Sequence, residues 1–114
     1  MKATEKDILR GGQFLVKETN CEDIFTPEDF SEEQQMMKEA VTEYVDREIW
    51  PNKAHIEAKD YALTESCMRK AGEMGFLGVS VPEAYGGMGM GFVSTMLVCD
   101  YISGATASFS TAFG

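Results

Sequence analysis

The feature that most constrains this sequence is a C-terminal third that carries almost no charge. Between Gly75 and Cys99 the one charged residue is Glu83, and the helix-like segment that follows adds only Asp100. Seven of the eleven glycines also fall between Gly72 and Gly91. A loop and helices this apolar are stable when another layer of protein covers them. We therefore expect this third of the chain to be buried within a larger body.

Apolar side chains recur at helical spacing through much of the rest of the chain. A Ser-x-x-Gln capping box at 31–34 precedes the first long pattern, and Trp50-Pro51 interrupts it because the residue before proline avoids the α region. Thr64 is expected to cap the next helix and Gly75 to end it. The helices predicted in this way cover residues 31–49, a short continuation through 60, 64–75, 92–103 and 108–113.

These patterns predict an all-α fold, namely a small bundle of about four to five helices with a Gly-rich loop before the fourth helix. Residues 1–30 are expected to form an N-terminal arm with a short helical turn, where 26–29 (Thr-Pro-Glu-Asp) has the form of a capping box. Residues 31–114 are expected to form the helical domain. Thr106 or Ser108 would cap its last helix, which we expect the end of the chain to cut short.

The composition argues against several classes of function. The chain has 114 residues, which is room for one domain, and a formal net charge of −9. A protein that binds nucleic acids or anionic lipids needs clustered Lys and Arg side chains, so neither is an expected partner of this acidic chain. The three cysteines form no CxxC pair, so we expect neither a disulfide framework nor a metal site. Residues 1–7 lack the apolar segment of a signal peptide, and the uncharged stretch 84–99 is too short for a membrane span, so we expect a cytoplasmic protein.

Local motifs do not assemble into a catalytic site. The run from Gly86 to Gly91 fails both the GxGxxG and the Walker A patterns at Phe92, where they need glycine and lysine. His55 is the one histidine, and no Ser-His-Asp or Cys-His arrangement can be built around it. We therefore expect no catalytic, cofactor-binding or metal-ligating residue in this chain. Met88 and Met90 are interpreted as loop packing, with insertion into a neighbouring groove as the alternative.

One block of the sequence resembles a known family. Residues 75–87, GFLGVSVPEAYGG, resemble the N-terminal domain signature of the acyl-CoA dehydrogenase family, in which a glycine-terminated helix leads through an apolar link into Pro-Glu-x-Tyr-Gly-Gly. Residues 11–15 (GGQFL) and 25–34 (FTPEDFSEEQ) are similar to the leader and first helix start of the longer bacterial branch. The resemblance covers essentially the whole chain from about Gly11.

We interpret the Pro82, Glu83, Tyr85, Gly86 and Gly87 block as architectural, because it would orient the two helices that flank it. Pro82 fixes its own φ, and the two glycines permit backbone angles that a side chain would forbid. Tyr85 brings a large ring with a polar tip that needs a partner.

The resemblance implies that the chain is the N-terminal helical domain of an FAD-dependent acyl-CoA dehydrogenase, an enzyme of α,β-dehydrogenation of acyl-CoA thioesters. It implies FAD as cofactor, acyl-CoA as substrate and an electron acceptor as partner. The family's flavin-binding β-domain and the domain with its catalytic glutamate have no counterpart in these residues, so the chain alone is not expected to hold FAD or to be active. Phe109, Ser110 and Phe113 would line the acyl chain, with plain core packing as the alternative for both phenylalanines.

A second hypothesis remains open beside this one, in which the chain is a non-catalytic helical module for protein interaction that folds as a monomer. The family hypothesis predicts instead that the apolar faces from Phe92 to Phe113 are exposed or covered by another copy, so that the chain self-associates through its C-terminal helices.

Overall fold

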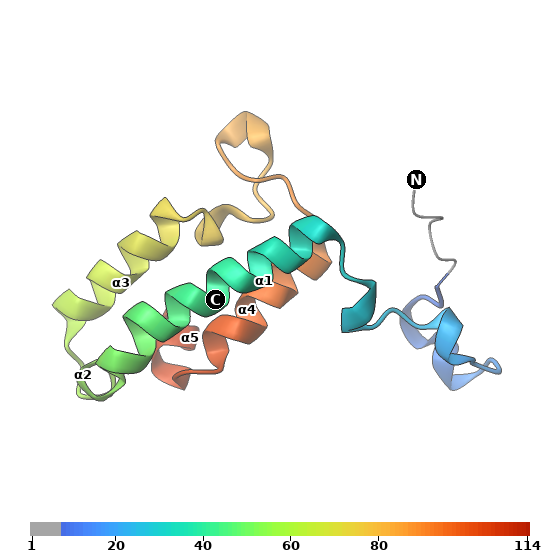
Figure 1. Ribbon diagram of the computed structural model, residues 1–114, viewed down its shortest axis with the longest axis horizontal. Coiled ribbons are helices and arrows are strands. Elements are labelled where there is room, and N and C mark those ends of the chain that lie inside the picture. The colour runs from blue at the N-terminus through green and yellow to red at the C-terminus, as the bar shows by residue number, and fades with distance from the viewer. Residues whose placement is uncertain (1–7) are drawn as a thin grey trace. The chain divides into compact units, whose positions relative to one another are not determined.

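The computed structural model describes residues 8–114 (Figure 1). By its internal contacts the chain divides into two units, with the boundary after Ser31. In the described residues the regular elements are helices and helical turns, with no strand among them, so the predicted all-α class is confirmed. Residues 1–7, on which the argument against a signal peptide rests, lie outside the described residues.

The first unit is built from short 3-10 turns. Gly11 adopts a φ of 55°, and the glycine pair there begins a turn that runs to Leu15. The capping box predicted at the next helical start is confirmed, since the Thr26 backbone N–H donates to Asp29 Oδ2 at 2.8 Å. The aromatic rings of Phe25 and Phe30 pack together with centroids 5.8 Å apart. The turns of this unit are Gly11–Leu15, Cys21–Asp23 and Pro27–Asp29.

The second unit is a bundle of α-helices. These are α1 (Glu32–Tyr44), α2 (Lys53–Glu57), α3 (Tyr61–Glu73), α4 (Phe92–Ser103) and α5 (Ala107–Phe113). α4 packs along α1, and α5 packs on α4 and α2. Figure 1 shows the loop between α3 and α4 at one end of the bundle and α2 at the other. The Gly-rich loop therefore precedes the fourth helix, as predicted.

The first long helix departs from the regular α-helix predicted over 31–49. α1 ends at Tyr44, and the chain widens into a π-helical turn over Val45–Ile49 before tightening into a 3-10 turn over Trp50–Asn52. Pro51 has no amide hydrogen, and its ring crowds the carbonyl one turn earlier. The predicted break at the proline is present, but its effect on the helix already begins a full turn upstream.

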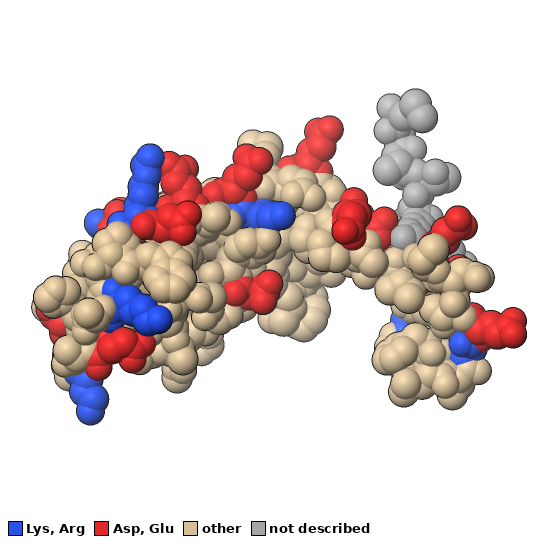
Figure 2. Space-filling model, turned by 60° about the horizontal axis from the view of Figure 1, so that its bottom comes forward, with Lys and Arg blue, Asp and Glu red and all other residues tan. Residues whose placement is uncertain are grey.

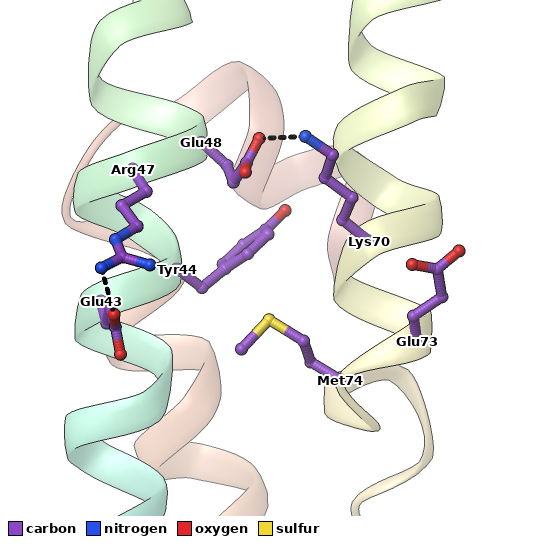
Figure 3. A pocket seen from close by; sticks show the side chains of 7 residues that line it. All are labelled: Glu43, Tyr44, Arg47, Glu48, Lys70, Glu73 and Met74. Atoms are coloured by element: carbon purple, nitrogen blue, oxygen red, sulfur yellow. Dashed lines mark hydrogen bonds and ion pairs between the residues drawn. The ribbon is translucent and has the colours of Figure 1, made fainter.

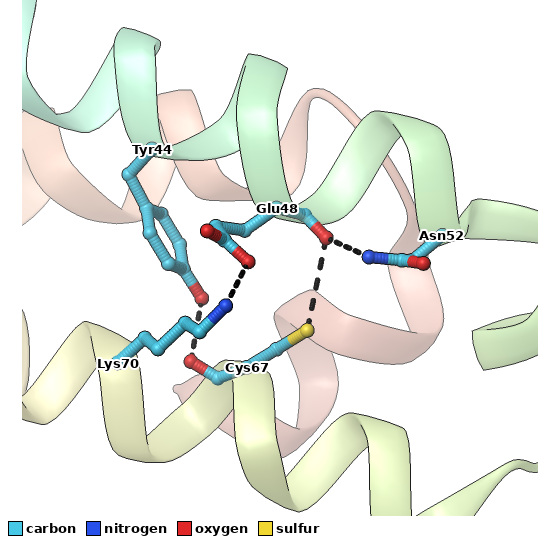
Figure 4. A network of polar contacts seen from close by, with 5 residues as sticks. All are labelled: Tyr44, Glu48, Asn52, Cys67 and Lys70. Carbon is cyan, nitrogen blue, oxygen red and sulfur yellow. Dashed lines mark hydrogen bonds and ion pairs between the residues drawn. The ribbon is translucent and has the colours of Figure 1, made fainter.

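The wide turn exposes the Glu48 carbonyl to side-chain donors (Figure 4). The Asn52 amide donates to this oxygen at 2.8 Å, and the Cys67 thiol lies 3.7 Å from it. These contacts satisfy a backbone group that a widened helix would leave unpaired. They also tie the end of the first long helix to α3.

The start of α3 corrects one sequence prediction. Asp60 caps this helix, because its side chain accepts from the Leu63 N–H at 3.1 Å. Thr64 lies within the first turn and donates back to the Asp60 carbonyl at 2.9 Å. The earlier start is possible because Lys59 takes a left-handed φ of 65°, which ends α2 directly before Asp60. At the other end, the predicted stop at Gly75 is confirmed by its φ of 85°.

Tyr44 is the centre of the core of the second unit. Its side chain is 2% exposed, and its ring lies with its centroid 5.6 Å from that of Phe76 and 6.5 Å from that of Phe109. Its hydroxyl donates to the Cys67 carbonyl at 2.8 Å. One side chain therefore joins α1 to α3, to the loop after α3 and to α5.

The exposure of the last two helices only partly matches the sequence prediction. Leu97, Ile102 and Phe109 are buried within this single chain, so the expectation that they need another copy to cover them is wrong. They are covered because α4 lies along α1 and α5 closes over Tyr44. Phe92 and Met96, on the first half of α4, are exposed as expected.

Replacing Tyr44 by phenylalanine tests the central contact. Y44F removes the hydroxyl and keeps the ring, so we expect the free energy of unfolding to fall by about 1 kcal/mol, the typical net value of one hydrogen bond. Urea unfolding followed by circular dichroism measures it. Tyr61 is 74% exposed, and Y61F is the matched control with no expected change. Equal effects of the two variants would contradict a central role for Tyr44.

Candidate functional site

The loop between α3 and α4 folds back on itself without forming a strand. The Met88 N–H donates to the Gly78 carbonyl at 2.9 Å, and the Met90 N–H donates to the Val79 carbonyl at 2.8 Å. Met88 also lies over Gly75, where a Cβ would stand 3.2 Å from its sulfur. The amides of this glycine run are thus used within the loop, which agrees with its failure to match a phosphate-binding motif.

The Pro-Glu-x-Tyr-Gly-Gly block forms the tip of this loop. The Tyr85 N–H donates to the Pro82 carbonyl at 2.9 Å, and Gly86 follows with a φ of 83°. At Gly87 a Cβ would stand 2.0 Å from the Val81 carbonyl oxygen, so no residue with a side chain fits without moving the backbone. The Tyr85 ring is 83% exposed at this tip.

A shallow apolar depression lies where this loop meets α4 and α5. Its volume is about 230 Å³. The lining residues come from the loop, from one face of α4 and from the end of α5: Phe76, Leu77, Val79, Ser80, Thr95, Val98, Cys99, Phe113 and Gly114. No Asp, Glu, Lys, Arg or His is among them, so this surface suits an apolar group and offers no acid or base for proton transfer.

The three residues predicted to line an acyl chain lie at different depths. Phe113 is half-buried and lines the depression. Phe109 is fully buried, with its ring centroid 6.5 Å from that of Phe113, and it does not line the depression. Ser110, the residue after Phe109, is half-buried and does not line the depression.

Sequence reasoning missed the contributions of Phe76, Val98 and Cys99 to this depression. The one available signal was the apolar character of α4 around most of its circumference, which indicated burial but not which side would remain partly open.

A second depression lies between the π-helical turn and α3 (Figure 3). Its volume is about 390 Å³, and the Tyr44 ring and the Met74 side chain point into it. Two ion pairs border it. Arg47 pairs with Glu43 at 2.8 Å, and Lys70 pairs with Glu48 at 2.5 Å.

Three titratable groups near this depression, Tyr44, Cys67 and Lys70, have raised pKa values. Burial, followed by the neighbouring Cys67 and Glu48, raises the pKa of the Tyr44 phenol. Burial, with Glu48 next in importance, raises the pKa of the Cys67 thiol. The hydrogen bond to Glu48 raises the pKa of Lys70. At neutral pH the phenol and thiol therefore stay neutral and the amine stays charged, so none of these three groups is in the form that acts as a nucleophile or base.

The face of the molecule that Figure 2 draws carries charges of both signs. Figure 2 shows acidic and basic side chains interspersed on the visible face instead of a patch of one sign. Within residues 8–114 no cluster of three or more His, Cys, Asp or Glu side chains is placed to hold a metal ion. The same residues contain no helix long and apolar enough to cross a membrane.

Comparison with known proteins assigns this fold. The family model described as "Acyl-CoA dehydrogenase, N-terminal domain" matches residues 31–114. The chain belongs to the acyl-CoA dehydrogenase family. This confirms the resemblance seen in residues 75–87.

Several acyl-CoA dehydrogenases are similar over much of the chain. A probable acyl-CoA dehydrogenase of Bacillus subtilis (strain 168) is 35% identical over 108 residues, which is 95% of this chain and 18% of the relative. The mitochondrial isovaleryl-CoA dehydrogenase of Solanum tuberosum is 30% identical over 86 residues, 75% of this chain and 21% of the relative. The chain therefore spans about a fifth of the length of these relatives.

A solved acyl-CoA dehydrogenase shares the fold. The crystal structure of an acyl-CoA dehydrogenase from Bacillus anthracis, complexed with FAD, superposes with a TM-score of 0.83 at 36% identity. The match covers 93% of this chain and 18% of that one.

Gly87 provides a test of the loop in this acyl-CoA dehydrogenase domain. We expect G87A to lower the free energy of unfolding by about 1–3 kcal/mol, because the new Cβ collides with the Val81 carbonyl. G78A is the matched control, since a Cβ there would meet Gly87 Cα at an ordinary 3.6 Å. Urea unfolding of both variants measures the difference. A G87A variant as stable as G78A would show that the loop does not need this glycine.

Proposed function

We propose that this chain acts as the N-terminal helical domain of an FAD-dependent acyl-CoA dehydrogenase and supplies one wall of its acyl-binding site. The observation that carries the proposal is the family match over residues 31–114. The apolar, uncharged depression beside α5 supports it, because a fatty-acyl chain is bound by apolar surface and not by charge.

In this proposal the end of α5 meets the substrate. Phe113 lies at the surface of the depression and Ser110 one turn earlier, while Phe109 fixes α5 on the Tyr44 ring from below. The Pro82–Gly87 block holds the loop that completes the wall. The depression itself supplies no group for proton abstraction, since no acid or base lines it.

FAD is proposed as the cofactor of the whole enzyme, whereas the donor groups of residues 75–114 do not fit its phosphates. Residues 75–114 contain no Lys or Arg, and the Met88, Gly89 and Met90 amides donate to carbonyls of their own loop. The solved relative from Bacillus anthracis that is complexed with FAD supports the assignment to the family. We infer no reaction step through the flavin from these residues.

Acyl-CoA and an electron acceptor are the partners that this proposal implies. The exposed Phe92 and Met96 on α4 are the surface through which the chain would associate with another layer of protein. A cytoplasmic location is also proposed, supported by three free cysteines, one of them exposed.

A chimera tests the function. The matching segment of the Bacillus subtilis relative is replaced by this chain, and the purified chimera is mixed with acyl-CoA thioesters of different chain lengths. We expect it to retain FAD and to lose the visible absorbance of the flavin when a suitable acyl-CoA is added. We expect the 114-residue chain alone to retain no stoichiometric FAD. A folded, FAD-containing chimera that no acyl-CoA reduces, beside an active parent, would refute the proposal.

The role of Phe113 is tested in the same chimera. F113A shortens the side chain that lines the wall, so we expect the ratio of kcat/KM for longer over shorter acyl-CoA to rise roughly tenfold. Thr111 is exposed on the same helix, and T111A is the control that leaves this ratio unchanged. A ratio that F113A does not alter would remove Phe113 from the proposed wall.

A further inference from the structure

α5 has little intrinsic reason to be a helix. It spans Ala107–Phe113, and a helix this short is not stable in water without tertiary contacts. Phe109 anchors its middle by burial against Tyr44. Something else must fix its first turn.

The first turn of α5 is held by a carboxylate from α2. Thr106 caps α5 by accepting from the Ser108 N–H at 3.3 Å. The Thr106 hydroxyl in turn donates to Glu57 Oε1, and the Ser108 hydroxyl donates to Glu57 Oε2 at 2.9 Å. Both oxygens of one carboxylate therefore contact the start of α5. Thr106 is 4% exposed, so its hydroxyl has little access to water as a substitute acceptor.

The position of Glu57 is unfavourable for the stability of its own helix. It is the last residue of α2, where a negative charge opposes the helix dipole. The two hydroxyls from which its carboxylate accepts hydrogen bonds belong instead to the start of α5. The residue is thus explained by what it does for α5 and not by the stability of α2.

We propose that Glu57 is a positioning residue whose carboxylate holds the first turn of α5 against α2 and thereby sets where Phe113 lies in the acyl-pocket wall. The second half of this inference rests on the proposed function, whereas the first half concerns the chain alone.

The chain itself tests the first half. Hydrogen exchange followed by NMR measures the Ser110 and Gly114 amides, which are bonded within α5, against amides of α3. We expect E57A to speed exchange of the α5 amides by about tenfold, as the loss of ordinary hydrogen bonds would, and S108A to have a smaller effect. E65Q removes an exposed carboxylate bonded only to Arg69 on its own helix, and it is the control with no effect on α5. Unchanged α5 exchange in E57A would overturn the proposal.

A pH profile separates this role from general packing. The hydroxyls of Thr106 and Ser108, in that order, lower the pKa of Glu57. Protection of α5 should therefore be complete above the ordinary carboxyl range and be lost as pH falls through the lowered pKa. Lys53 acts on Glu57 from its own helix, Lys59 and Tyr61 line the same depression as Glu57, His55 and Asp60 lie close to it in sequence, and α5 itself carries no charge.

E57Q supplies the matched variant for this profile, because it keeps the shape of the side chain and cannot ionise. We expect its α5 protection to be weaker than that of the wild type and to show no step at the Glu57 pKa. A step of the same size in E57Q would assign the transition to other acids and refute the role of Glu57.

Kinetics of the chimera test the link to the acyl pocket. E57Q is expected to raise KM for acyl-CoA several-fold, because the displaced Phe113 would weaken substrate binding, while kcat changes little. An unchanged KM in a chimera whose α5 has loosened would refute the link to the acyl pocket. The role of Glu57 in holding the first turn of α5 would still stand. If the chimera with the wild-type segment fails to reduce its flavin, the proposed function fails, and the exchange data still decide the role of Glu57 in holding α5.

Discussion

The burial of the Tyr44 side chain is the constraint on which the second unit depends. A phenol can enter a core only if its hydroxyl finds a partner, and the Cys67 carbonyl fixes where α3 must lie relative to α1. The ring then provides the apolar surface on which Phe76 and Phe109 pack from two other segments. One residue therefore positions three helices, α1, α3 and α5, and the loop that follows α3.

Local chemistry made a good part of this fold predictable. Gly75 could end a helix because it alone among its neighbours takes a left-handed φ without strain. The Thr26 and Asp29 capping box could be recognised because its hydrogen bonds lie within four consecutive residues. The family block at 75–87 was equally readable, since Gly86 takes a positive φ and Gly87 has no room for a side chain inside the same loop.

Features that depend on distant segments, or on a backbone conformation without a strong sequence signal, were not predictable. Asp60 and Thr64 are both good caps, and the choice between them depends on Lys59, whose left-handed φ has no strong sequence signal. The burial of Leu97 and Ile102 depends on α1 lying beside α4, which no pattern within α4 reveals. In the candidate site, the spacing of Phe109 and Phe113 puts both on one face of α5. Phe109 is nevertheless buried in the core, whereas Phe113 lines the apolar depression. The two side chains differ in how deeply they are buried, and burial depends on the segments that pack against α5.

The π-helical turn at Val45–Ile49 has a consequence for how this segment accommodates change in length. A π turn holds one residue more than an α turn over the same rise, so it is equivalent to a single-residue insertion absorbed within a helix. In a regular α-helix an extra residue would rotate the downstream chain by about 100° around the helix axis. Because the wide turn takes in that residue, the chain beyond it keeps its direction toward α2, and the carboxylate that α2 carries stays within reach of α5.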